Sequence, residues 1–155
     1  MNNNKIINAL LSALGALIFI SFLAFLENSF DGTIWLIPPF GASMVLVMAV
    51  HESPLAKPTN ILLGHILSAL SGVIVLYLIG DHFIALGLAV GLAIFVMIVT
   101  NTIHPPAGAN PIIVILTGQS ISFVFFPVAI GALMLVLFAY LYLSLIHISE
   151  PTRPY

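Results

Sequence analysis

Long apolar stretches alternate with short polar connections along most of the chain. Four of them, residues 6–26, 61–79, 83–103 and 121–142, are about as long as the 20 or so helical residues that a bilayer crossing needs. The first rises about 31 Å as a helix, which matches the hydrocarbon thickness. A secretory signal peptide is the alternative for that stretch, but its apolar run exceeds the usual length of about 7–15 residues. The pattern predicts four full membrane spans.

Two shorter apolar stretches begin with nearly the same letters. Residues 38–43 read PPFGAS and residues 105–110 read PPAGAN, so both contain a Pro-Pro-x-Gly-Ala motif, and the motifs start 67 residues apart. Each motif follows one full span and precedes another, so the order of elements repeats as well. We interpret this as an internal duplication. Coincidence in a membrane sequence rich in glycine and proline is the alternative.

The two motifs predict broken helices. Proline lacks an N–H and disfavours helix in the residue before it, so we expect extended backbone there. Ser43 and Asn110 occupy equivalent positions and are good N-cap residues, and Pro111 suits the first helical position, so short helices are expected to begin after them. Irregular backbone at membrane depth is tolerated only inside protein or beside a wet cavity. Broken helices in corresponding halves of a chain are typical of a transporter's binding site.

The few charged residues give an orientation. If the first motif segment crosses fully, Lys5 and Lys57 lie on the cytoplasmic side and Glu27, Asp31 and Asp81 lie outside, as the positive-inside rule prefers. Each repeat then crosses three times and the second copy is inverted. If both segments re-enter, the copies are parallel. We favour inversion, and expect an all-α integral membrane protein with five to six membrane segments, two of them short and broken at the motifs.

Composition excludes several classes of protein. Hydrophobic residues make up 61% of the 155 residues and charged residues 5%, and the mean hydropathy is +1.24, which no water-exposed globular surface tolerates. The net charge of −2 gives no basic surface for nucleic acid. The absence of cysteine removes thiolate catalysis and cysteine-ligated metals. The expected surroundings are therefore the lipid bilayer, with no nucleic-acid partner.

Small residues recur at helical spacing in two spans. Gly64, Ser68 and Gly72 are four residues apart, and Gly87 and Gly91 form a GxxxG pair. This spacing lets helix backbones approach closely within lipid, although scattered small residues with no shared interface are the alternative. Because so few crossings leave little interior, we expect a homo-oligomer.

The end of the chain resembles a translated artefact. Residues 143–153, LSLIHISEPTR, are what the codons of a transposase-library sequencing adaptor would encode in frame. A natural polar tail is the alternative. We therefore divide the chain into a transmembrane domain, 1–142, and an adaptor-like segment, 143–155, to which no function is assigned.

Several separated motifs resemble those of a known family, the HPP transmembrane proteins. The family is named for the His-Pro-Pro motif that stands here at residues 104–106, within TIHPPAGA at 102–109. PFGAS at 39–43, SPLAxPxN at 53–60 and GHxLSA with a later glycine at 64–72 match as well, so the resemblance covers roughly residues 36–117. It implies a small polytopic membrane protein. Some members are described as nitrite transporters of chloroplasts and cyanobacteria, others have no known substrate, and some longer members carry CBS-type modules.

The candidate site centres on the two motifs and two histidines. His104 opens the second motif and His65 lies inside a span, where an ionisable group is costly enough to indicate a role. Backbone N–H groups near the motif glycines are expected to cradle an anion, and Asn101 to line the route to His104. The predicted substrate-binding residues are Pro38, Pro39, Gly41, Ala42, Ser43, His65, Asn101, His104, Pro105, Pro106, Gly108, Ala109 and Asn110. A helix-capping histidine, a satisfied interhelical hydrogen bond and glycines that only permit packing are the structural alternatives.

We therefore expect a transporter of a small inorganic anion, with nitrite the substrate that the resemblance implies, in a bacterial plasma membrane. The alternative is a non-transporting subunit that assembles with or modulates another membrane protein. Phosphate-loop, HExxH and GxSxG motifs are missing, so an enzyme is not expected. The histidines lack metal-ligand spacing on one helix face, so neither a metal nor another cofactor is expected.

Overall fold

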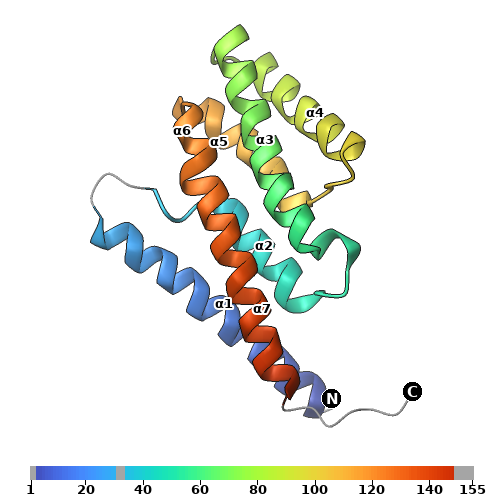
Figure 1. Cartoon of the computed structure of the whole chain (residues 1–155). Helices are drawn as coiled ribbons and strands as arrows, with labels where there is room; N and C mark the ends of the chain where they lie inside the picture. The colour runs from blue at the N-terminus through green and yellow to red at the C-terminus, as the bar shows by residue number, and fades with distance from the viewer. Residues whose placement is uncertain (1–2, 31–33, 149–155) are drawn as a thin grey trace.

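The computed structural model describes residues 3–30 and 34–148, which are helical with short connections and contain no strand (Figure 1). The all-α prediction is confirmed. Asp31 and residues 149–155 of the adaptor-like segment lie outside the described residues. The elements are α1 (Asn3–Ser29), α2 (Pro38–Ala49), η1 (Pro54–Ala56), α3 (Pro58–Ile79), α4 (Phe83–Val99), η2 (Pro105–Ala109), α5 (Asn110–Thr117), α6 (Ile121–Phe123), η3 (Val124–Ala129) and α7 (Ile130–Ile148).

Three helical stretches of the described chain are long and apolar enough to cross a membrane: α1, α3 and Ile121–Ile146, which runs from α6 into α7. The last of these is kinked at Phe126, where the backbone is not helical. The remaining predicted span, residues 83–103, is shorter than expected. Its helix, α4, has 17 residues and ends at Val99, because the chain turns at Asn101, whose φ of +55° is left-handed. Residues 100–103 are therefore not part of a helical span, and α4 rises about 26 Å.

The prediction of extended backbone within the two motifs is wrong. Ile37 and His104, which precede the two motifs, are extended, but α2 begins at Pro38 itself and the second motif forms the 3₁₀ helix η2. Proline is tolerated in the first helical turn, where its missing N–H would have had no partner. Ser43 consequently lies within α2 and caps no helix. Helix α5 does begin at Asn110, but the side chain of this residue reaches across to α3.

Successive segments alternate in direction (Figure 1). Helices α1 and α3 run from the lower to the upper part of the view, α2, α4 and α7 run back down, and α5 rises again from η2. Each predicted repeat therefore contributes three segments of alternating direction. The inverted relation of the two repeats stays a prediction.

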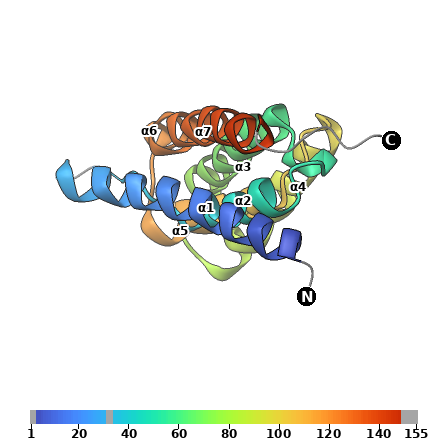
Figure 2. The same ribbon diagram turned by 90° about the horizontal axis from the view of Figure 1, so that it is seen from below.

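The largest core cluster surrounds α2. Phe40 and Met44 of α2 are buried against Phe19 of α1 and Val128 and Leu135 of the last span. Helices α1 and α7 run alongside each other across the molecule (Figure 2). This arrangement places one face of α2 between α1 and α7, and another faces η2. Phe40 and Ser43 of α2 also reach His65 of α3.

Glycines set the closest approaches between helices. A Cβ atom on Gly72 of α3 would lie 2.8 Å from the Pro111 Cα, and one on Gly64 would lie 2.8 Å from the His104 Cβ. The GxxxG pair of α4 behaves differently, since a Cβ on Gly87 or Gly91 would meet nothing within 4 Å. Helix α4 instead buries a stripe of small residues, Ala85, Ala89 and Ala93, on its other face. In α4, alanines spaced four residues apart therefore allow the close helix packing that the sequence suggested for the glycines.

We expect Gly72→Ala to lower the free energy of unfolding by about 1–3 kcal/mol, because the new methyl group overlaps backbone atoms of α5 that cannot move away cheaply. Gly41→Ala is the matched control: a Cβ there meets nothing within 4 Å, and alanine is the better helix former. Thermal unfolding of the purified protein in detergent tests the pair. Equal midpoints for both variants would contradict the close packing of α3 on α5.

Candidate functional site

Four polar side chains from four parts of the chain meet in the interior. Ser43 comes from α2, His65 from α3, His104 from the residue before η2, and Asn110 from the start of α5. Each is 0% exposed. The two copies of the Pro-Pro-x-Gly-Ala motif are thus brought together, because Ser43 closes the first motif and His104 and Asn110 flank the second. We call these four side chains the polar network.

Hydrogen bonds join the network into a chain. The Ser43 Oγ lies 2.8 Å from the Nε2 of His104 and 2.9 Å from the Nε2 of His65. At one end, His104 Nδ1 lies 3.0 Å from the Leu55 carbonyl oxygen. At the other end, the Asn110 Nδ2 lies 3.0 Å from His65 Nδ1, and it also contacts the His65 carbonyl and the Ser68 hydroxyl. The two imidazole rings are 5.0 Å apart, centre to centre.

With both rings neutral, these contacts permit only one placement of the hydrogens. A carbonyl only accepts, so His104 carries its hydrogen on Nδ1 and its Nε2 accepts from the Ser43 hydroxyl. That hydroxyl has a single hydrogen, so toward His65 it must accept, and His65 carries its hydrogen on Nε2. The bare Nδ1 of His65 then accepts from the Asn110 amide. Every link has one hydrogen and one lone pair.

This placement also fixes the orientation of the Asn110 amide. Its nitrogen must face His65, because a hydrogen on His65 Nδ1 would leave two bare Nε2 atoms competing for one hydroxyl hydrogen. The His65 carbonyl demands the same orientation. The amide oxygen, Oδ1, is consequently turned away, and it is buried without a hydrogen-bond partner.

Local packing explains how His104 reaches the network. Gly64 leaves room beside α3 for the His104 Cβ. A larger residue at position 64 would collide with that Cβ and with the Thr102 carbonyl. Asn60 holds the same segment from the other side, since its Nδ2 donates to the carbonyls of Ile103 and Pro54. Asn60 is therefore a functional candidate that the sequence interpretation missed. The asparagine in the SPLAxPxN motif was the available signal, but nothing in the pattern named a partner 43 residues away.

The other predicted site residues lie outside the polar network. Asn101 is exposed just beyond the end of α4, and its place on a route to His104 stays a prediction. Ala42, Pro105 and Pro106 line a surface groove of about 470 Å³ between α2 and η2. The remaining members of the predicted set differ in burial: Pro39 is buried, Gly41, Gly108 and Ala109 are half-buried, and Pro38 is exposed.

The expected anion cradle of backbone N–H groups needs correction in the first motif. Ser43 lies beyond the first turn of α2, where backbone N–H groups bond within the helix. Side chains therefore supply the polar character of this site. No group of three His, Cys, Asp or Glu side chains that could hold a metal ion occurs among residues 3–30 and 34–148 that the structure describes.

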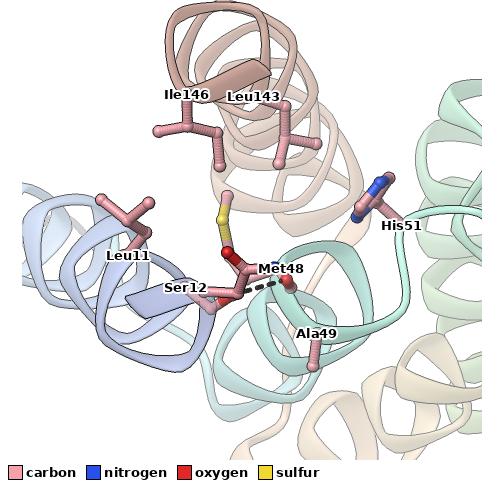
Figure 3. A pocket seen from close by; sticks show the side chains of 8 residues that line it. Leu11, Ser12, Met48, Ala49, His51, Leu143 and Ile146 are labelled. Carbon is pink, nitrogen blue, oxygen red and sulfur yellow. Dashed lines mark hydrogen bonds between the residues drawn. The ribbon is translucent and has the colours of Figure 1, made fainter. Parts of the chain in front are cut away.

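A separate pocket of about 180 Å³ lies between α1, the end of α2 and α7 (Figure 3). Its walls include His51, Leu143 and Ile146, and a hydrogen bond from the Ser12 hydroxyl to the Met48 carbonyl, 2.9 Å long, crosses beside it. None of the network residues lines it. We therefore assign no function to this pocket.

We expect Ser43→Ala to destabilise the protein by about 1–3 kcal/mol for each buried group that loses its partner, namely the two Nε2 atoms. Ser71→Ala is the matched control, since Ser71 is also buried on α3 but bonds only to its own helix, at the Leu67 carbonyl. Chemical unfolding in detergent compares them. If the control costs as much as Ser43→Ala, the hydroxyl does not connect the histidines.

Comparison with known proteins agrees with the resemblance seen in the motifs. Two transmembrane proteins of Dictyostelium discoideum match, one at 41% identity over 115 residues and the other at 38% over 112 residues. These matches cover 69% and 67% of this chain but only 37% and 39% of the relatives, so the chain spans less than two fifths of their length. No solved structure matches. The family model described as "HPP, transmembrane region" matches residues 1–152, and the chain therefore belongs to the HPP transmembrane family.

Proposed function

We propose that this integral membrane protein carries a small inorganic anion across the bilayer, with nitrite as the substrate. The observation that carries the proposal is the polar network, which joins both copies of the repeated motif inside an otherwise apolar protein. The nitrite transport described for some family members supports the choice of anion. The bacterial plasma membrane stays a prediction, since the matched relatives are from Dictyostelium discoideum.

Burial of these groups is costly, which favours a functional interpretation. Polar and ionisable side chains within membrane segments are rare, and they mark substrate paths and proton relays more often than they serve packing. A core of the same volume built from apolar residues would avoid the need to satisfy each N–H and O–H group. The chain nevertheless places two imidazoles, a hydroxyl and an amide together, with no lipid contact.

The charge of the surroundings suits an anion. Helices α2, α3, α4 and α5 contain no Asp or Glu, so no fixed negative charge within them would repel it. Imidazole, hydroxyl and amide groups all donate hydrogen bonds that oxyanions accept. An anion that entered between Ser43 and His104 would compete for donors that already bond to one another.

Transport requires the network to open, because all four side chains are fully enclosed. The Ser43–His104 hydrogen bond connects the two motif-bearing segments directly. Separation of α2 from η2 would break this bond and expose the groups to one side of the membrane. Movement of the same segments at their other ends would expose them to the opposite side, as alternating access demands.

Nitrite flux into proteoliposomes tests the proposal. The full chain should show saturable uptake, and His104→Ala should lower it by about tenfold or more, as expected for a lost hydrogen bond to a charged group. Ser71→Ala should transport like the unaltered chain. Chloride and nitrate in parallel define selectivity, and protein-free liposomes measure passive permeation.

The alternative function, a non-transporting subunit, predicts a different result. Folded protein with no flux of any anion in the panel, and with one partner protein in fixed ratio after mild solubilisation, would contradict the carrier. Unaltered flux in His104→Ala would instead leave a carrier whose site lies outside the polar network.

A further inference from the structure

The polar network in its neutral form has one acceptor too many. Asn110 Oδ1 is buried and unpartnered, and the hydrogen placement described above holds it there, because the amide nitrogen must face His65. A buried acceptor without a partner costs about 1–3 kcal/mol. The enclosed network therefore lacks one hydrogen.

We propose that the network takes up one proton together with each transported anion, that the proton binds Nδ1 of His65, and that the Asn110 amide links the two events. The proposal rests on the proposed anion transport and names its coupling ion. Proton uptake forms one new N–H bond on His65, breaks no covalent bond and makes the ring a cation. The Nε2–H of His65 still donates to Ser43, so the hydrogen bonds from Ser43 to His104 and from His104 to Leu55 are unchanged.

The new N–H needs an acceptor where the Asn110 amide nitrogen now lies, 3.0 Å away. A half-turn of the amide brings Oδ1 to that place and pairs it with the His65 N–H, at the cost of the amide's hydrogen bonds to the His65 carbonyl and the Ser68 hydroxyl. The His65 carbonyl keeps a donor, because the Ser68 hydroxyl bonds to it. The amide nitrogen then occupies the position where Oδ1 had no hydrogen-bond partner. Protonation thus replaces an unpartnered acceptor with two N–H donors that face away from His65.

A small anion satisfies what protonation creates. Its oxygens accept the two amide hydrogens, and its charge offsets the imidazolium, so each ligand improves the site for the other. The pair that crosses is electrically neutral, which avoids the cost of moving a net charge through the bilayer.

Sequence and burial identify His65 as the simplest proton site. Helices α2, α4 and α5 carry no titratable side chain, and the other one on α3, Tyr77, is 88% exposed. Glu52, His51 and Lys57, in the connection to α3, are exposed as well. His104 is the remaining candidate, but its Nδ1–H is occupied by the Leu55 carbonyl, and a proton on its Nε2 would require Ser43 to reverse.

Proteoliposomes containing a pH-sensitive dye test the coupling, with the membrane potential clamped by potassium and valinomycin. An inward nitrite gradient should acidify the lumen by one proton per nitrite ion above protein-free liposomes, and an imposed pH gradient should drive nitrite to accumulate. Ser71→Ala should behave the same, and His65→Gln should lose accumulation. Saturable nitrite flux without proton movement would overturn the coupling and leave the anion carrier standing, whereas absent flux would overturn the proposed function itself.

Nitrogen NMR of protein labelled at histidine reports the protonation state of the rings, which distinguishes proton binding from a loss of packing. In the full chain, saturating nitrite should convert the His65 ring from the neutral Nε2–H form to the doubly protonated form, with the signal assigned by its absence in His65→Gln. The same protein without nitrite should show two neutral, opposite tautomers for His65 and His104. A His65 ring that stays neutral while nitrite is bound would overturn the proton site.

Discussion

The hydroxyl of Ser43 has a single hydrogen, and two imidazole rings lie within hydrogen-bonding distance of its oxygen. This shortage of one hydrogen imposes opposite tautomers on His65 and His104, turns the Asn110 amide, and leaves the amide oxygen without a partner. The Ser43 hydroxyl also connects α2 both to α3 and to the segment before η2, while Asn110 connects α5 to α3. The apolar packing of these four elements is compatible only with positions in which these hydrogen bonds form.

Apolar packing brings the helices close enough for these side chains to meet. Gly64 admits His104 beside α3, and Gly72 admits the first turn of α5, so Asn110 can reach back to His65. Asn60 fixes the connection from which His104 enters. The network is therefore the product of close approaches at small residues, and a change of one methyl group at either glycine alters hydrogen bonds that the glycine does not itself make.

The sequence predicts the helices well because hydrophobic length is a local property. It also indicates candidate site residues, because polar side chains are rare in apolar stretches: Ser43, His65, His104 and Asn110. It does not predict that they touch, because contacts between residues 22 to 61 positions apart depend on tertiary packing. The prediction of extended backbone in the two motifs was wrong for a local reason. A proline disfavours helix in the residue before it, but the proline itself fits well in the first turn of a helix. Likewise, α4 ends early because of the left-handed turn at Asn101, which hydropathy does not register.

The packing of α7 on α2 bears on how such a protein arose. The Phe40 ring lies against Gly131 of α7, with no room there for a side chain, while α4 is seated on α3. Helix α7 of the second predicted half thus packs on α2 of the first, and α4 of the second half packs on α3 of the first, so each half is covered by helices of the other. On the predicted duplication, a single copy of the repeat would lack the partner helix that each half receives from the other. Such a copy would have to exchange helices with a second molecule to bury the same surface.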